Sequence, residues 1–234
     1  MDENKTWIQK FKSGLATSIP LYIGYFPTAI AFGLLARNTG ISFRDTVLFS
    51  TVVYAGASQF MALEMIALGL SGINIVIATF LLNLRHMVMS ASLSINLKDI
   101  DRKFLPIIGW GITDESFSVL SFNKDKLELP FVLGVNSAAI SWILGTIVGF
   151  LVGEILPVSL QASLGIGLYA MFAGLIFPEI RKSRKILTVA IISLVVYLIL
   201  FYSNLFRDGW DIILGIIISS LLAVMLLSRE GEKI

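Results

Sequence analysis

Residues 186–204 read ILTVAIISLVVYLILFYSN, a stretch that contains no charged side chain. A bilayer core of about 30 Å needs roughly 20 apolar residues for one helical crossing. Comparable apolar stretches lie between charge clusters at residues 15–36, 45–69, 73–95, 104–122, 131–153, 160–178 and 210–228. The sequence therefore predicts an all-α polytopic membrane protein with about eight transmembrane helices.

Composition supports this class for the whole chain. Of its 234 residues, 56% are hydrophobic and 15% are charged, and the mean hydropathy is +0.85. We expect a cytosolic N-terminal segment at 1–14, a single transmembrane domain at 15–228 and a C-terminal tail at 229–234. A chain without cysteine and with one histidine offers no disulfide framework and no thiolate metal site. We therefore expect no metal and no cofactor, and the net charge of +2 gives no basis for nucleic-acid binding.

The fourth apolar stretch, 104–122, is unusual because Thr113, Asp114, Glu115 and Ser116 lie at its middle. It either crosses the bilayer with these groups satisfied by protein or lies as a re-entrant or interfacial segment, which leaves seven crossings. Eight crossings with a cytosolic N-terminus place 11 Lys and Arg residues inside and 6 outside. The positive-inside rule therefore favours eight.

A weak internal repeat predicts two halves, at 15–122 and 131–228. Pro20, Gly24, Ala29 and Ile30 recur 110 positions later as Pro130, Gly134, Ala139 and Ile140. Tyr54-Ala55 recurs as Tyr169-Ala170. Two-fold repeats are common in transporters, with the substrate site near the midplane between the halves.

Ionisable residues inside apolar stretches are functional candidates because they are costly in lipid unless paired or hydrated. If 73–95 and 104–122 form an antiparallel hairpin, Arg85 and Asp114 lie at matching depth, roughly 21 to 22 Å from the turn at 1.5 Å per residue. We therefore expect Arg85 to pair with Asp114 or Glu115. The alternative to a transport role is a static ion pair that holds two helices together.

Two further ionisable residues are candidates for proton coupling. His86 has an unperturbed pKa near neutral pH, and Glu64 does not match the depth of Arg85, so it is the carboxylate that is free to be protonated and to cycle. The structural alternative is a hydrogen-bonded histidine in a helix. Gly145, Gly149 and Gly153 form two overlapping GxxxG steps, which we interpret as a helix-packing face.

Residues 54–60, YAGASQF, place small and polar side chains in the middle of a predicted span. Such a composition permits close helix packing or an unwound stretch whose backbone groups face a zwitterionic ligand.

Four motifs together resemble those of the large subunit of the AzlC-type branched-chain amino-acid permeases. They are Phe26-Pro27 with Gly33, the Ala55 to Phe60 run, Asn83-Leu84-Arg85-His86, and Thr113-Asp114-Glu115-Ser116-Phe117. The resemblance is densest from Gly24 to Asn123. It implies export of valine, leucine, isoleucine and in some cases methionine across the bacterial inner membrane. It also implies a small hydrophobic AzlD-type partner subunit.

The resulting hypothesis is a proton-coupled secondary transporter subunit, since the chain contains no Walker A motif for direct ATP coupling. We expect it not to be an enzyme, because no GxSxG sequence marks a nucleophile. Arg85 is expected to face the substrate carboxylate and Asp114 or Glu115 the ammonium. The full set of expected substrate-binding residues is Ser58, Gln59, Phe60, Asn83, Arg85, Asp114 and Glu115. The alternatives are a membrane scaffold subunit and an intramembrane acyl-transfer enzyme that uses a serine, His86 and a carboxylate.

Overall fold

A computed structural model describes residues 6–97, 100–153, 177, 180, 181, 183–203 and 210–231. In these residues every regular element is helical and no strand occurs. Four stretches are long and apolar enough to cross a membrane: Ile19–Asn38, Gly72–Ser94, Leu129–Val152 and Arg184–Ser203. The expected class, an all-α polytopic membrane protein, is confirmed. The number of crossings stays a prediction.

The described residues group into two compact units. The first unit takes its residues from 1–60 and 83–165, and the second from 61–82 and 166–234. These units are not the two consecutive halves expected from the internal repeat, which stays a prediction. Apart from Phe177, the span expected at 160–178 lies outside the described residues, as does the Tyr169-Ala170 match.

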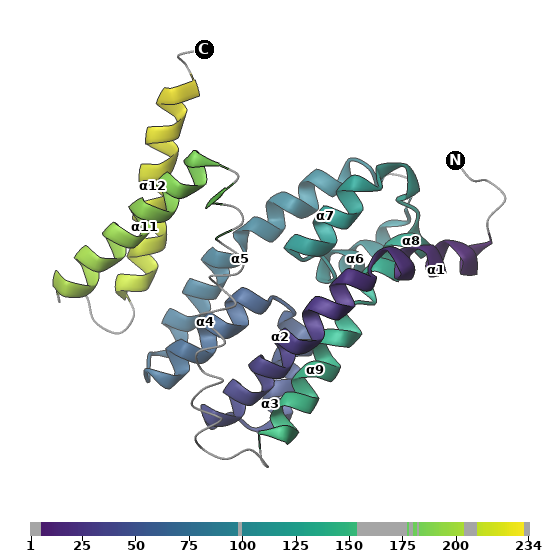
Figure 1. The fold of residues 1–234 in the computed structure, drawn as a ribbon, viewed down its shortest axis with the longest axis horizontal. Helices are drawn as coiled ribbons and strands as arrows, with labels where there is room; N and C mark the ends of the chain where they lie inside the picture. Colours follow the sequence, from purple (N-terminus) through teal and green to yellow (C-terminus); the bar gives the residue numbers. More distant parts are fainter. Residues whose placement is uncertain are drawn as a thin grey trace. The chain divides into compact units, whose positions relative to one another are not determined.

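The frame of the first unit consists of two parallel helical rods (Figure 1). One rod is α1 (Trp7–Thr17) followed by α2 (Ile19–Asn38), and the other is α8 (Leu129–Asn136) followed by α9 (Ala139–Val152). Pro20 and Pro130 lie in the first turns of α2 and α8, where a missing N–H costs nothing.

Glycine allows these rods to pack with their backbones in contact. A Cβ on Gly33 would lie 2.1 Å from the Thr146 carbonyl oxygen, and one on Gly149 would lie 2.0 Å from that of Ile30. The Tyr22 hydroxyl donates to Ser137 Oγ at 2.7 Å, and Ser141 Oγ donates to the Tyr22 carbonyl at 2.8 Å. The expected packing role of the glycine ridge in residues 145–153 is therefore confirmed.

The stretch expected as one helix at 45–69 is broken in its middle. It forms α3 (Phe43–Leu48), a π-helical turn (Phe49–Val53) and α4 (Gly56–Ala67). Tyr54 has φ +42° and ends the π turn in the left-handed region, which is uncommon for a residue with a side chain. The unwound stretch considered from the sequence is therefore present.

The chain reverses direction at this break. Phe49 and Phe60 lie on opposite sides of the break, yet both pack against Phe32, with ring centroids 5.9 and 5.5 Å away. Gln59 Nε2 donates to Ser50 Oγ at 3.1 Å. In a straight helix these last two residues would be about 13.5 Å apart along the axis. The arms on the two sides of Tyr54 therefore lie side by side.

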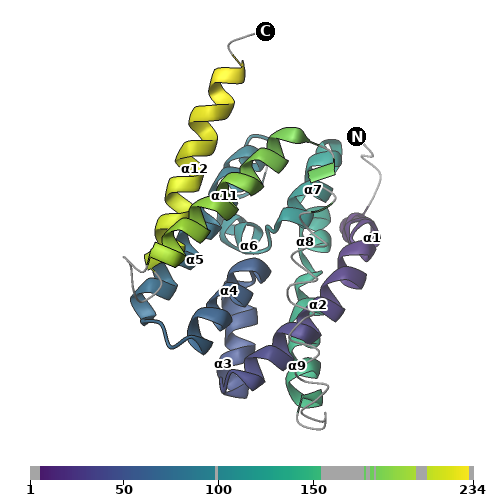
Figure 2. The ribbon, with the colours of Figure 1, turned by 60° about the vertical axis from the view of Figure 1, so that its left-hand side comes forward.

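The stretch 104–122 is also broken. A 3₁₀ turn (Arg102–Phe104) leads into α6 (Leu105–Trp110), and after residues 111–113 the chain continues as α7 (Asp114–Phe122). A second 3₁₀ turn (Lys124–Lys126) precedes α8. Both α6 and α7 pack against α8, whereas α3 packs against α9 (Figure 2). The two broken stretches therefore contact opposite ends of the same rod.

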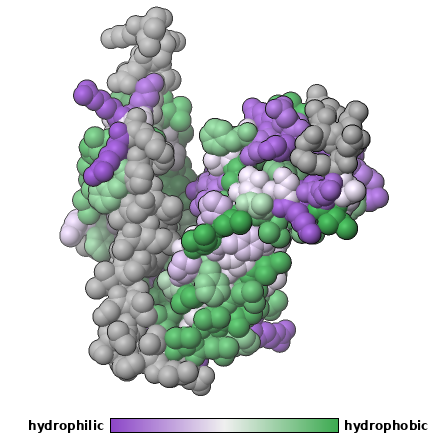
Figure 3. All heavy atoms as spheres, turned by 45° about the vertical axis from the view of Figure 1, so that its right-hand side comes forward, coloured by the Kyte–Doolittle hydropathy of each residue, from purple (hydrophilic) through white to green (hydrophobic). Residues whose placement is uncertain are grey.

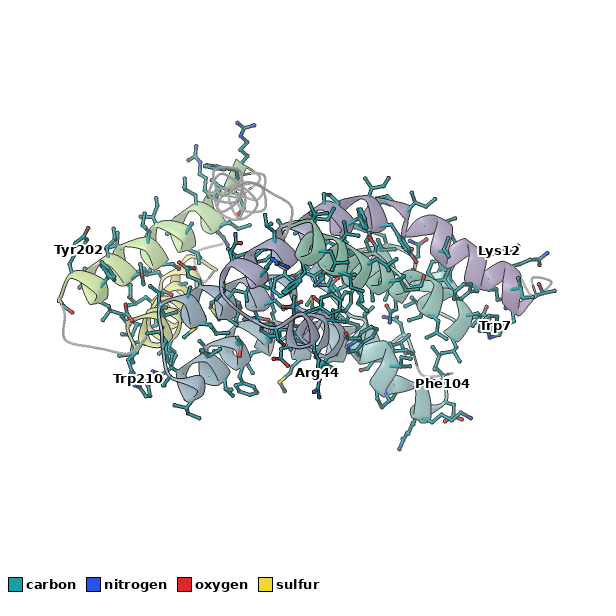
Figure 4. The ribbon with its side chains drawn as sticks, turned by 90° about the horizontal axis from the view of Figure 1, so that it is seen from below. Trp7, Lys12, Arg44, Phe104, Tyr202 and Trp210 are labelled. Carbon is teal, nitrogen blue, oxygen red and sulfur yellow. The ribbon has the colours of Figure 1, made fainter. Side chains whose placement is uncertain are left out.

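The helix α5 (Gly72–Ser94) contributes to both units. Within the second unit, Met65 of α4, Ala78 of α5 and Ile213 form a buried cluster. In the same unit, α11 (Arg184–Ser203) packs along α12 (Trp210–Gly231). Tyr202 and Trp210 mark neighbouring ends of these two helices (Figure 4), and both side chains are exposed. Such aromatic residues are typical of the membrane–water interface.

The outer surface of the described helices is largely hydrophobic. Large apolar side chains are exposed on α2 at Ile19 and Ile23 and on α9 at Ile140, Leu144 and Leu151. The space-filling view shows hydrophobic residues over much of the visible surface (Figure 3). This distribution fits helices that face lipid.

Candidate functional site

The two broken stretches of the first unit meet at their tips. Tyr54, at the first break, stacks on Trp110, at the second, with ring centroids 5.0 Å apart. Trp110 Nε1 donates to the Thr51 carbonyl oxygen at 2.9 Å. A side chain from one broken helix therefore satisfies a backbone carbonyl of the other, and the two tips form one continuous structure.

Neutral side chains hold the first break. Gln59 Oε1 accepts from the Ala55 N–H at 3.2 Å, and Ser58 Oγ donates to the Ala55 carbonyl at 2.9 Å. Ser50 Oγ then joins Gln59 Nε2 to the Thr146 hydroxyl on α9, at 3.1 and 2.8 Å. These side chains are fully buried. They replace the backbone hydrogen bonds that the break removes, as burial requires.

The second break begins α7 with a capping box. Thr113 Oγ1 accepts from the Ser116 N–H, and Ser116 Oγ accepts from the Thr113 N–H. The Tyr25 hydroxyl from α2 lies 2.5 Å from Thr113 Oγ1 and donates to Glu115 Oε2 at 3.0 Å. The first turn of α7 is therefore anchored to α2 by a tyrosine that sequence reasoning did not select.

Arg85 and Asp114 form an ion pair. Arg85 Nη1 lies 2.9 Å from Asp114 Oδ2, and the two side chains are 41% and 48% exposed. The pairing expected from the sequence is confirmed for Asp114. Glu115 instead bonds to Tyr25. The ion pair lies at the start of α7, where a negative side chain is favoured by the helix dipole.

The other predicted substrate residues lie close by but are already engaged. Ser58 and Gln59 maintain the first break, as described above. Phe60 is buried against Phe32 and Trp142. Asn83 of α5 donates from Nδ2 to Ser58 Oγ at 2.9 Å. The substrate-binding roles of these residues stay predictions.

The two residues expected to couple protons are placed differently. His86 follows Arg85 on α5 and is partly buried in the first unit. Glu64 lies on α4 among the residues of the second unit, and its side chain is exposed. Both proton-coupling roles stay predictions.

Three buried polar atoms in the described part of the chain have no hydrogen-bond partner: Asn83 Oδ1, Asn136 Oδ1 and Trp142 Nε1. Asn136 donates from Nδ2 to the Ile108 carbonyl at 3.1 Å, and a Cβ on Gly111 would collide with its amide. The ring of Trp142 lies against Gly56 in the same way. Each unpartnered atom therefore belongs to a side chain that touches a residue next to one of the breaks.

Sequence reasoning missed Tyr25, Asn136 and Trp142 because it selected candidates from ionisable groups and from the short motifs at 54–60 and 83–86, and these three residues lie outside both. A neutral amide inside the apolar run 131–153 was the available signal, since a buried amide needs partners. In the described residues no group of three or more His, Asp and Glu side chains is arranged to hold a metal ion.

Broken helices with buried polar tips and a charged pair, on a lipid-facing helical scaffold, define the class of polytopic membrane transport proteins. The profile of the AzlC protein family matches residues 20–156, which include both breaks and the ion pair. The chain belongs to the AzlC family.

Three similar proteins illustrate the family. A membrane protein of Archaeoglobus fulgidus is 32% identical over 95% of this chain and 96% of its own length. The Escherichia coli inner membrane protein YgaZ is 30% identical over 77% of each chain. The Bacillus subtilis branched-chain amino acid transport protein AzlC is 26% identical over 75% of this chain and 70% of its own length. No solved structure matches the chain.

Proposed function

We propose that this chain is the large subunit of a secondary transporter that exports valine, leucine, isoleucine and methionine across the bacterial inner membrane. Family membership and the B. subtilis relative support a role in transport. We infer the class of substrate from the Arg85–Asp114 ion pair, which lies beside two broken helices. It places one cation beside one anion, as a zwitterion requires, while the neighbouring carboxylate Glu115 is bonded to Tyr25.

In this mechanism the substrate exchanges with the ion pair. The amino-acid carboxylate takes the place of Asp114 on Arg85, and the ammonium takes the place of Arg85 on Asp114. Because both the pair and the zwitterion are neutral, the exchange leaves no uncompensated charge in the membrane. The unpartnered amide oxygens of Asn83 and Asn136 are further acceptors near the breaks and suit the ammonium donors.

A scaffold subunit remains the second candidate function, because a hydrophobic AzlD-type partner is part of the proposal. An acyl-transfer enzyme has less support. Its only histidine, His86, has no hydrogen bond to a serine hydroxyl among the described residues, and Ser58 donates to a backbone carbonyl instead.

Transport is tested by counterflow of radiolabelled leucine in proteoliposomes that contain this chain with and without its small partner. We expect exchange that the other three substrates inhibit and that a charged amino acid such as glutamate does not. Verified insertion with no exchange in the presence of the partner would exclude the transporter and favour the scaffold.

Proton coupling is tested with Glu64→Gln. We expect this variant to lose the pH dependence of transport while substrate exchange continues, because a carboxylate that cycles between protonation states has been replaced by a neutral isostere. Asp125→Asn, at an exposed position outside the apolar stretches, is the control and should keep the dependence. Wild-type pH dependence in Glu64→Gln would leave Glu64 with a structural role.

A further inference from the structure

We propose that residues 43–67 and 105–122 do not cross the bilayer. They form two re-entrant helical hairpins that enter from opposite faces and meet at Tyr54 and Trp110. This assignment goes beyond the proposed function and does not depend on it. It replaces eight crossings by six: α2, α5, α8 with α9, the apolar stretch 160–178, α11 and α12.

The first argument is the reversal at each break. Phe49 and Phe60 lie at the level of Phe32, while Tyr54 between them lies against Tyr25, about two helical turns away along α2. The chain therefore descends to Tyr54 and returns. At the second break, α6 and α7 both pack on α8, while the residues between them reach Asn136 and Tyr25.

The second argument is the parallel direction of the two rods. The residue numbers of contacting positions increase in the same direction along the two rods. The contacts are Tyr22 with Ser137, Phe26 with Gly145, and Ile30 with Gly149. Parallel spans require an odd number of crossings between them. Two re-entrant hairpins leave only α5, which satisfies this requirement, whereas a re-entrant 104–122 alone leaves two crossings and an antiparallel pair.

The third argument is the distribution of positive charge. With eight crossings, Lys98, Arg102 and Lys103 lie outside the cell, and the balance is 11 inside to 6 outside. With two hairpins these three residues move inside, and the balance becomes 14 to 3, with only Arg37, Arg44 and Arg207 outside. The positive-inside rule therefore favours two hairpins over two full crossings at these stretches.

The fourth argument is burial of the tips. Non-helical backbone is tolerated at membrane depth only where protein covers it. Tyr54 and Ala55 at the first tip are buried, and so are Ile112 and Thr113 at the second. The Ala55 N–H and carbonyl are bonded to the side chains of Gln59 and Ser58, and the Thr113 N–H is bonded to Ser116. Both tips thus meet the condition for re-entrant segments.

Single-cysteine labelling tests the topology directly, since the natural chain has no cysteine and gives no background. Exposed positions flank each hairpin: Asn38 and Ser71 the first, and Asn96 and Asp125 the second. Each is replaced by cysteine in the full chain with its partner and exposed in intact cells to a membrane-impermeant maleimide. Lys12→Cys marks the cytosolic side.

Two hairpins predict labelling of Asn38→Cys and Ser71→Cys in intact cells, and labelling of Asn96→Cys and Asp125→Cys only after permeabilisation, as for Lys12→Cys. Eight crossings predict the reverse for Ser71 and Asn96. Gly72→Cys is a second probe of the first loop should Ser71→Cys lower expression. Opposite sides for Asn38 and either loop probe, or for Asn96 and Asp125, would overturn the proposal, whatever the transport assays show.

Discussion

The two broken segments both interrupt an apolar stretch, but the side chains that hold the two breaks differ in charge. At the first break, the side chains of Ser50, Ser58 and Gln59 are fully buried and uncharged, and every bond that holds the turn runs between neutral groups. At the second, Asp114 and Glu115 open α7, and the Arg85–Asp114 pair is half exposed. The first break is held by neutral groups, whereas the second carries charged groups that can exchange partners with a charged ligand.

The largest effect is expected from a substitution at the first break, which is held by neutral side chains. Gln59→Leu leaves the buried Ala55 N–H without its partner and removes one of the two bonds of the Ser50 hydroxyl, and an unsatisfied buried group costs about 1–3 kcal/mol. We expect a strong loss of folded protein, measured as the fraction that stays monodisperse after heating in detergent. Gln9→Leu, the same change at an exposed capping residue of α1, is the control. Equal stability of the two variants would contradict a structural role for Gln59.

The next effect concerns the charged side. Arg85→Ala leaves Asp114 without its ion-pair partner. An unpaired charge costs about 3–5 kcal/mol when it is buried, and it costs less at a half-exposed pair such as this one. We expect Arg85→Ala to reduce abundance more than Arg85→Ala combined with Asp114→Asn and Glu115→Gln. Both variants should lose transport, because both lose the partners of the zwitterion. Equal abundance in the single and triple variants would count against coupling between these residues.

The smallest effect is expected where α2 contacts the second break. Tyr25→Phe keeps the ring but removes the hydroxyl that joins α2 to Thr113 and Glu115, and a hydrogen bond to a charged group contributes about 1.5–3 kcal/mol. Tyr22→Phe removes a neutral bond to Ser137 and should cost less, about 0.5–1.5 kcal/mol. Thermal midpoints of the purified variants measure the difference. A larger loss in Tyr22→Phe would show that Glu115 is not held through Tyr25.

Sequence reasoning identified the helical membrane class and the Arg85–Asp114 pair, because apolar length and the cost of charge in lipid are local properties of the chain. The pair was deduced from the depth of a continuous helix, yet Asp114 lies at a break. Hydrophobicity cannot distinguish a stretch that crosses from one that turns back, since both are apolar. The roles of Asn136 and Trp142 depend on which glycine each one touches, and only the fold shows that.

The π-helical turn at Phe49–Val53 carries a consequence for motion. A π turn accommodates one residue more than an α-helical turn, and such turns are frequent at functional sites. If this turn converts to α-helix, the residues after it shift by one position in the helical hydrogen-bond pattern, and their side chains rotate by about 100° around the helix axis. Release of the Thr51 carbonyl from Trp110 would permit this shift, so Tyr54 can swing away from Trp110 while α3 and α4 both remain folded.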